Sequence, residues 1–175
     1  MARMMDMALF YRFPNRKNVL RHGKAGIAAC AVKYRMNFLT LDQTNSATVA
    51  QWLEDGRWVT ACLCAAWCDT CNSYRSKFAE LASVHPEHRF VWIDIEDQAD
   101  LVGDFDIENF PTLLIQRKGV VSFFGTTLPE IKLADRLLRA QIDKDDAELR
   151  REAASSEERR EWQSERNLAG RLSQP

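Results

Sequence analysis

Apolar residues in the middle of the chain follow two different spacings, and the two spacings alternate. Short continuous apolar runs are typical of buried strands, whereas apolar residues three or four positions apart are typical of helices that pack on one face. The runs predict strands at residues 37–41, 58–64, 89–95, 112–116 and 120–124. The helical spacing predicts helices from a cap at Asp42, Thr44 or Ser46 to Gly56, over residues 71–83 and 98–105, and from residue 129 onward.

The order of these elements predicts an α/β fold. Helices that alternate with strands indicate a central sheet that is covered by helices on both faces. Lys118-Gly119 separates the last two strands and predicts a hairpin, so one edge of the sheet should be antiparallel and the sheet should be mixed. A segment of about a hundred residues is long enough to form one such domain with its own core. We expect this domain at residues 37–142.

The strongest chemical signal is the segment Cys68-Asp69-Thr70-Cys71, which follows Trp67 directly. Two cysteines with two residues between them can close a small disulfide ring. A cysteine at a helix N-terminus is stabilised as a thiolate by the helix dipole and by free backbone N–H groups. A strand, a CxxC segment and a helix in this order are typical of a thiol–disulfide redox site.

A CxxC pair can also be half of a structural zinc site, or an inert pair. A structural zinc site generally needs four ligands, commonly in two separate pairs. Cys62 and Cys64 instead alternate within a predicted strand, and the sequence contains no second CxxC. The three histidines, His22, His85 and His88, are scattered and are expected in loops or at the surface. We therefore expect a redox-active pair and no metal.

Residues 37–140 resemble the thioredoxin family, because Trp67 and the cysteine pair are followed further along the chain by Phe110-Pro111-Thr112. The resemblance implies the thioredoxin fold and a cis peptide bond before Pro111; taken without the resemblance, this proline would instead be expected to be trans at a strand start. It also implies that Cys68 attacks substrate disulfides and that Cys71 resolves the mixed disulfide. Trp67, Phe110 and Pro111 are expected to bind an extended substrate segment, and no cofactor is needed.

Two departures from the family pattern concern the electrostatics of this site. Asp69 and Thr70 stand where a typical thioredoxin has Gly-Pro, and a carboxylate beside Cys68 is expected to raise the pKa of that thiol. A thiolate that is not specially stabilised is typical of a reductant rather than of a strong oxidant. Cys62 and Trp92 align with a buried Asp and Lys of the family, so proton transfer at the second cysteine should be slower or use water. Cys62 is expected to pack as a small apolar residue, with a third redox thiol as the alternative.

The two ends of the chain differ from its middle in composition. Residues 1–36 form a basic extension that we expect to be disordered or absent from the mature protein, with Met36 as a possible start. The first 35 residues hold eight Lys and Arg and one Asp, whereas the whole chain has a net charge of −1. Residues 143–175 mix acidic and basic side chains and are expected to be a solvated helical or disordered tail. The large apolar residues of this tail are Leu149, Trp162, Leu168 and Leu172.

These features predict a protein-disulfide reductase that acts on disulfide-containing proteins and takes electrons from a separate reductase. We expect a cytoplasmic monomer without nucleic-acid or membrane partners, since no apolar run approaches the ~20 residues of a transmembrane helix. Ile27-Ala28-Ala29-Cys30 resembles a lipoprotein cleavage box but lacks a preceding apolar segment, which disfavours a periplasmic or membrane-anchored protein. Two other functions stay open: a partner-binding module with little redox activity, and an exported disulfide oxidant or isomerase.

Overall fold

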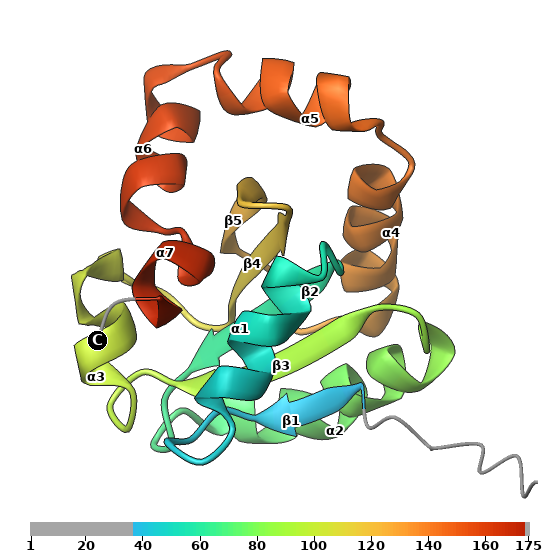
Figure 1. Ribbon diagram of the computed structural model, residues 1–175. Helices are drawn as coiled ribbons and strands as arrows, with labels where there is room; N and C mark the ends of the chain where they lie inside the picture. Colours follow the sequence, from blue (N-terminus) through green and yellow to red (C-terminus); the bar gives the residue numbers. More distant parts are fainter. Residues whose placement is uncertain (1–36, 174–175) are drawn as a thin grey trace, which may run out of the picture. The chain divides into compact units, whose positions relative to one another are not determined.

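The computed structural model describes residues 37–173, which form a five-stranded sheet with helices on both faces (Figure 1). The strands are β1 (Phe38–Thr40), β2 (Val59–Cys64), β3 (Arg89–Asp94), β4 (Thr112–Arg117) and β5 (Val120–Thr126). The helices between and after them are α1 (Ser46–Glu54), α2 (Asp69–Val84), α3 (Ala99–Val102) with the 3-10 turn η1 (Gly103–Phe105), and α4 (Ile131–Ile142). Every strand and helix predicted between residues 37 and 142 is present. The predictions for residues 1–36, His22 and Met36 included, fall outside the described residues.

The strands lie in the order β1-β3-β2-β4-β5, and the sheet is mixed, as predicted. β3 pairs in parallel with β1 and β2, whereas β4 is antiparallel to β2 and β5. β2 is the central strand, and all six of its residues are buried. The residues that follow β2 therefore leave the sheet from the middle of one end. None of the described helices is both long enough and apolar enough to cross a bilayer.

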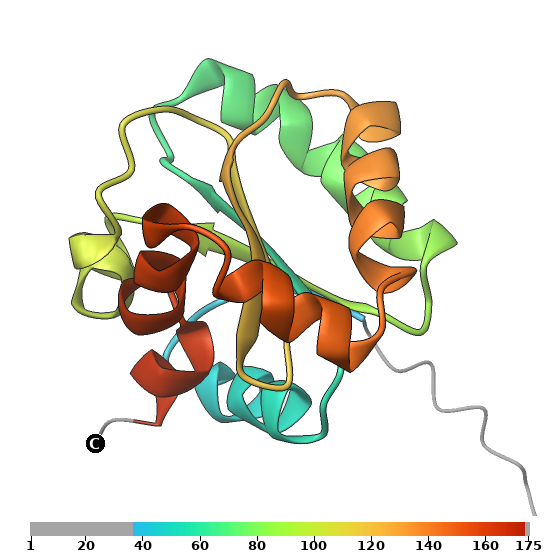
Figure 2. The same ribbon diagram turned by 90° about the horizontal axis from the view of Figure 1, so that it is seen from above.

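Each face of the sheet carries its own core. Successive residues of a strand point to opposite faces, so Cys62 and Cys64 face one core while Ala61 and Leu63 face the other. The first core lies under α2 and α4 and contains Tyr74 of α2. The second lies under α1 and α3, and Figure 2 shows α2 and α4 on one side of the sheet and α1 on the other. Both cysteines of β2 thus lie on the side of the sheet that α2 covers.

The C-terminal segment is helical, one of the two states predicted for it, but it packs against the sheet instead of forming a solvated tail. It forms α5 (Asp146–Ala153), α6 (Glu157–Glu165) and α7 (Leu168–Leu172). Leu149 is buried in the core under α2 and α4, whereas Trp162 and Leu168 are buried in the core under α1 and α3. The segment therefore passes around the edge strand β5 from one face of the sheet to the other (Figures 1 and 2). The few large apolar residues among the charges all pack in or against one of the two cores.

Side-chain amides of the C-terminal segment cover the outer edge of β5. Gln163 accepts a hydrogen bond from the Val121 backbone N–H and donates one to the Val121 backbone carbonyl, both at 2.9 Å. Asn167 donates to the Gly119 carbonyl at 2.9 Å and accepts from the Gln116 side chain. An edge strand presents unpaired backbone groups that can pair with another chain. These amides satisfy several of those groups within the molecule.

Candidate active site

The candidate site lies where β2 ends and α2 begins. Cys64 is the last residue of β2, and Cys68 is the N-cap residue of α2. Two hydrogen bonds hold the turn between them: the Cys68 backbone N–H donates to the Ala65 carbonyl at 3.0 Å, and the Asn72 side chain donates to the Ala66 carbonyl at 3.0 Å. The short connection therefore fixes the first turn of α2 against the end of the central strand.

Cys68 has the environment expected of a reactive thiol. Its side chain is half-buried, and its Sγ accepts a hydrogen bond from the Cys71 backbone N–H at 3.4 Å. α2 runs for 16 residues from this point, so the partial positive charge of its N-terminus lies at the Cys68 sulfur. Backbone N–H groups and the helix dipole both stabilise a negative charge there. The geometry thus suits Cys68 to the nucleophilic role that the sequence predicts.

Cys71 forms its disulfide with Cys64 and not with Cys68. The Cα atoms of Cys64 and Cys71 are 5.9 Å apart, a usual separation for bonded cysteines. The strand periodicity turns Cys64 toward α2, and the first turn of α2 carries Cys71 inward to meet it. Cys68 keeps a free thiol in this state. The CxxC spacing gave no sign of this pairing. The available signal was strand alternation, which places Cys64 on the face of β2 that the helix after it covers.

A second free thiol lies beneath this disulfide. Cys62 is fully buried, and its Sγ is 3.8 Å from the Cys64 Sγ. Burial raises the pKa of the Cys62 thiol, so this group is neutral. Cys62 is also the register partner of Trp92 on β3, and both side chains lie in the core under α2. Where the family is expected to carry a buried ion pair, this protein has a thiol beside an indole.

An aromatic surface surrounds the Cys68 thiol. Trp67 is 66% exposed, and its ring meets Phe110 edge to face with the ring centroids 5.6 Å apart. The peptide bond between Phe110 and Pro111 is cis, which confirms the prediction. The indole N–H of Trp67 donates a hydrogen bond to the Glu96 carboxylate at 3.0 Å. The structure thus brings the three predicted substrate-binding residues together and adds Glu96, which no sequence pattern had indicated.

The two residues between Cys68 and Cys71 lie on the solvent-exposed side of α2. Asp69 and Thr70 are exposed in the first turn of the helix. The Asp69 carboxylate is therefore next in sequence to the Cys68 thiol and open to solvent. Its charge can act on an approaching partner as well as on the thiol.

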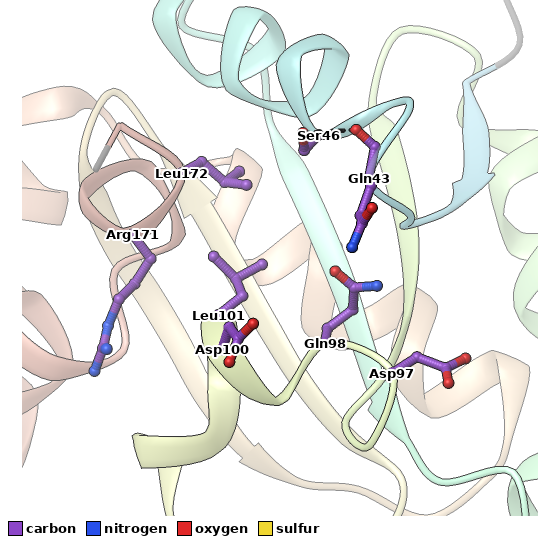
Figure 3. Close-up of a pocket in the computed structure, with 8 residues that line it drawn as sticks. All are labelled: Gln43, Ser46, Asp97, Gln98, Asp100, Leu101, Arg171 and Leu172. Carbon is purple, nitrogen blue, oxygen red and sulfur yellow. Dashed lines mark hydrogen bonds between the residues drawn. The ribbon is translucent and has the colours of Figure 1, made fainter. Parts of the chain in front are cut away.

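A polar recess lies beyond Glu96, between the loop before α1, the start of α3 and α7. It has a volume of about 430 Å³. The Gln43 and Gln98 side chains point toward one another across it, and Leu101 and Leu172 line another part (Figure 3). The remaining lining residues are Ser46, Asp97, Asp100 and Arg171. Because α7 contributes to this recess, the C-terminal segment shapes the surface at this part of the sheet.

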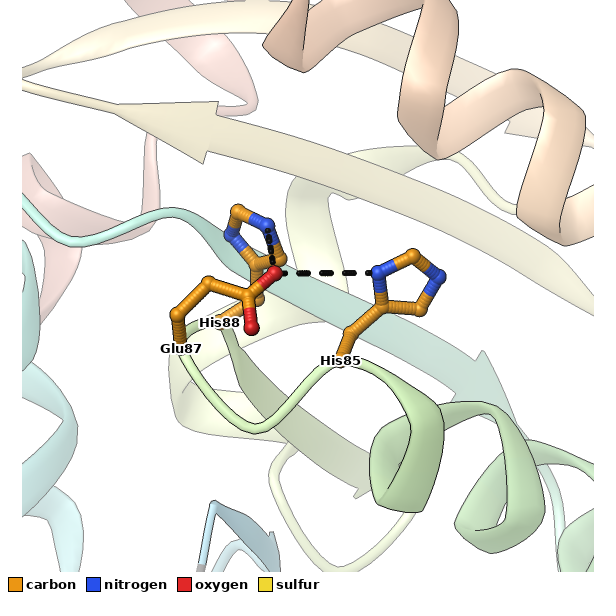
Figure 4. Close-up of side chains that lie close together, drawn as sticks. All are labelled: His85, Glu87 and His88. Carbon is orange, nitrogen blue, oxygen red and sulfur yellow. Dashed lines mark ion pairs between the residues drawn. The ribbon is translucent and has the colours of Figure 1, made fainter. Parts of the chain in front are cut away.

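His85 and His88 lie in the loop between α2 and β3, as predicted, but they are buried and come together with Glu87 instead of being scattered at the surface. Both imidazoles are buried, and the Glu87 carboxylate lies 2.9 Å from His88 Nε2 and 3.9 Å from His85 Nδ1 (Figure 4). The His85 Nε2 is 2.7 Å from the Asp135 carboxylate. The three residues could hold a divalent cation, since two imidazoles and a carboxylate form a donor set that zinc uses.

The surroundings of the cluster favour the uncharged form of His88. Burial lowers the pKa of His88, the charge of Glu87 counteracts this in part, and the charges of His85, Arg89 and Arg117 lower it further. The cluster lies at the C-terminal end of α2, whereas Cys68 lies at its N-terminal end. A helix of this length spans about 24 Å, so the cluster is separate from the cysteine site.

Comparisons with known proteins agree with this geometry. A family model described as Thioredoxin matches residues 40–138. Thioredoxin H4-1 of Oryza sativa is 30% identical over 86 residues, which make up 48% of this chain and 66% of that protein. Putative thioredoxin 2 of Streptomyces coelicolor is 32% identical over 98 residues, or 55% of this chain and 73% of that protein.

The solved structures show a likeness of fold. The crystal structure of a poplar thioredoxin h matches with a TM-score of 0.55 at 21% sequence identity and covers 62% of this chain and 99% of that one. This chain spans slightly less than two thirds of the length of the Oryza relative. The matched segment of the family model ends before α5, so the three C-terminal helices lie outside it.

Proposed function

This chain belongs to the thioredoxin family, and from that premise we propose that it reduces disulfide bonds in other proteins through Cys68 and Cys71. The observation that carries the proposal is the half-buried Cys68 thiol at the N-terminus of α2, beside the aromatic surface of Trp67 and Phe110. A nucleophilic sulfur needs both access to a partner and stabilisation of its thiolate. Cys68 has both.

The reaction begins with the protein in its reduced form, with thiols at Cys68 and Cys71. The Cys68 thiolate attacks one sulfur of a substrate disulfide, which forms a Cys68–substrate disulfide and releases the other substrate sulfur as a thiolate. Cys71 then gives up its proton and attacks the Cys68 sulfur. This step forms the Cys68–Cys71 disulfide and releases the second substrate sulfur. Two electrons pass from the cysteine pair to the substrate, and a separate reductase returns them.

The aromatic surface supports a role in holding a substrate. Trp67 and Phe110 present apolar area beside the Cys68 sulfur. The cis bond between Phe110 and Pro111 lies directly before β4, next to this surface. An extended segment could bind across this surface with its disulfide against Cys68. The hydrogen bond from Trp67 to Glu96 holds the indole in place for such contact. We further propose a reducing compartment such as the cytoplasm, where a reductase of this kind finds its electron donor.

Reduction of insulin disulfides by the purified protein, with dithiothreitol as electron donor, tests this function. We expect the wild-type protein to accelerate the reaction and Cys68→Ser to fall to the rate of dithiothreitol alone, because no other described sulfur can reach a substrate. Cys30→Ser is the matched control, since it removes a cysteine outside the described residues. A wild-type rate equal to that of dithiothreitol alone would overturn the proposal and favour a partner-binding module.

A further inference from the structure

Cys71 has two possible disulfide partners, and it can bond to one at a time. The structure bonds it to Cys64. Cys68 is the other neighbour: its sulfur lies 3.4 Å from the Cys71 backbone nitrogen, at the start of the same helical turn. Cys62 adds a fourth sulfur, 3.8 Å from that of Cys64. The site is therefore a group of four sulfurs in which Cys71 is shared between two possible disulfides.

We propose that Cys64 is a second redox partner of Cys71, and that exchange between the Cys64–Cys71 and Cys68–Cys71 disulfides switches Cys68 between two modes of reaction. This inference rests on the proposed function and deepens it. With Cys71 free, Cys68 belongs to a two-thiol reductase. With Cys71 bonded to Cys64, Cys68 is a single thiol that has no resolving partner.

The exchange is an internal thiol–disulfide reaction without net oxidation. The Cys64 thiolate attacks the Cys71 sulfur of a Cys68–Cys71 disulfide; the Cys64–Cys71 bond forms, the Cys68–Cys71 bond breaks, and Cys68 leaves as a thiolate. The proton that Cys64 gives up passes to solvent, and the negative charge ends on the Cys68 thiolate. The reverse reaction starts with attack by the Cys68 thiolate on Cys71. No external oxidant or reductant enters either direction.

Because the Cys64–Cys71 disulfide is buried, electrons can reach it only through Cys68. Cys64 is 1% exposed and Cys71 is fully buried, so a reductase cannot touch their bond from outside. Cys68 is half-buried and adjoins Cys71. Reverse exchange converts the buried bond into a Cys68–Cys71 bond, one sulfur of which a partner protein can attack. Electrons therefore enter through Cys68.

The surroundings of the Cys64 and Cys68 sulfurs favour the Cys64–Cys71 disulfide over the Cys68–Cys71 disulfide. Exchange in this direction replaces a buried Cys64 thiol with a Cys68 thiolate at the N-terminus of α2, where the helix dipole and a backbone N–H stabilise the charge. In the opposite direction a charge would appear on buried Cys64, and burial disfavours charge. The neutral Cys62 thiol can donate a hydrogen bond to such a Cys64 thiolate, which makes the reverse reaction possible without making it favourable.

The single-thiol mode has a distinct product. When Cys68 attacks a disulfide while Cys71 is bonded to Cys64, no second thiol resolves the mixed disulfide. Cys68 then stays covalently linked to the thiol that it has taken up. A small disulfide such as oxidised glutathione fits the half-buried sulfur, so the expected product is a stable Cys68–glutathione adduct on top of an intact inner disulfide.

Disulfide mapping distinguishes the two states because Trp67 separates Cys64 from Cys68. Fully reduced protein is oxidised with oxidised dithiothreitol, blocked with N-ethylmaleimide and digested with chymotrypsin, which cleaves after Leu63, Trp67 and Tyr74. A Cys64–Cys71 bond links fragment 64–67 to fragment 68–74 and leaves a blocked Cys68. A Cys68–Cys71 bond lies within fragment 68–74 and leaves Cys64 free. We expect the linked pair to predominate; an internal bond in fragment 68–74 with no linked pair would overturn the proposal.

Two variants complete the test. In oxidised Cys64→Ser we expect the bond to move to Cys68–Cys71, with loss of N-ethylmaleimide labelling at Cys68 and loss of the glutathione adduct. Cys62→Ala is the matched control, because it removes a buried thiol of the same strand and should keep the Cys64–Cys71 bond. Labelling of Cys68 that is the same in oxidised wild type and Cys64→Ser would overturn the switch. Should Cys64→Ser fail to fold, the wild-type map decides alone.

The mapping result is independent of the proposed function. Protein that reduces insulin but yields only the Cys68–Cys71 bond supports the reductase and overturns the switch. Protein that yields the Cys64–Cys71 bond but does not reduce insulin overturns the reductase, and with it the role of the switch in that reaction.

Discussion

Cys68 differs from the three other cysteines of the described chain because part of its side chain reaches solvent. Its sulfur is held by a single backbone N–H at a helix N-terminus, and its chain neighbours Trp67 and Asp69 are both exposed. Small changes at these neighbours should therefore alter the chemistry of the thiol without disturbing the core. Asp69 offers the clearest case, because its carboxylate is the acidic group in the first turn of α2.

At the residue scale we predict that Asp69→Asn makes the reduction potential of the Cys68–Cys71 couple less negative. A carboxylate next to a thiolate disfavours the thiolate, so removal of its charge stabilises the reduced form. We expect a shift on the order of 10–20 mV, the size typical of a single exposed charge. Equilibration with glutathione buffers measures the potential, in a Cys64→Ser background that leaves one couple.

The uncharged neighbour supplies the control for this measurement. Thr70→Ala changes the other residue between the cysteines without a change of charge and should leave the potential close to its starting value. A potential that becomes more negative in Asp69→Asn, or that moves equally in both variants, would contradict the electrostatic explanation.

At the scale of elements, the pairing of β5 with a side chain is the most specific contact of the C-terminal segment. Gln163 makes the two hydrogen bonds with the Val121 backbone that a neighbouring strand would otherwise make. The ring of Trp162, next to it on α6, packs against Phe123 and Phe124 of β5 with centroid separations of 6.3 and 6.5 Å. Polar and apolar contacts on adjacent residues thus hold α6 to the edge of the sheet.

We predict that Gln163→Ala lowers the free energy of unfolding by about 1–3 kcal/mol, because two backbone groups lose their partners in a half-buried place. Urea denaturation followed by circular dichroism measures the change. Glu161→Ala is the matched control on the same helix: its side chain is exposed, and this variant should unfold within about 0.5 kcal/mol of wild type. Equal stability of Gln163→Ala and wild type would mean that the edge contact contributes nothing to the fold.

For the whole molecule, the two ends of α2 carry different chemistry. Cys68 and Cys71 lie at the N-terminal end, and the cluster of His85, Glu87 and His88 lies at the C-terminal end. The pKa of His88 is lowered from its ordinary value of 6.5, chiefly by burial and also by the charges of His85, Arg89 and Arg117, while Glu87 opposes the shift. The folded state therefore binds a proton at His88 less readily than the unfolded state does.

We predict that the free energy of unfolding falls as the pH is lowered from about 7.5 to 5.5, because the unfolded state takes up a proton at His88 first. The contribution is present above the ordinary histidine pKa and is lost as the pH falls through the lowered folded value. In His88→Gln this part of the pH dependence should flatten. Urea denaturation at several pH values checks the prediction, and an unchanged slope in His88→Gln would contradict it.

The carboxylate of Asp135 should affect the free energy of unfolding at a lower pH than His88 does. Burial raises the pKa of Asp135, but hydrogen bonds from Arg139 and His85 outweigh this and leave it below its ordinary value of 3.8. Stability from Asp135 is therefore lost only as the pH falls below about 4. The contributions of His88 and Asp135 can therefore be distinguished in one series of unfolding measurements over pH.

Much of the fold and part of the site could be predicted from local pattern. The apolar spacing predicted each element up to α4, the CxxC motif predicted Cys68 at a helix start, and the family resemblance implied the cis bond before Pro111. The folded C-terminal segment was missed because its few apolar residues are spread over three short helices. None of these helices has a continuous apolar stripe, and each depends on contact with β5 or with a core already formed.

Local sequence was sufficient to predict the strands and helices up to α4, and a cysteine at the start of α2, because these features depend on near neighbours along the chain. The tertiary structure alone decided which side chains meet. Cys64 reaches Cys71 because β2 turns it toward a helix that packs on that face. His85 and His88 close on Glu87, and Asp135 of α4 reaches His85, because the chain turns back between α2 and β3. Such meetings depend on packing between elements, which the spacing of residues along one element does not encode.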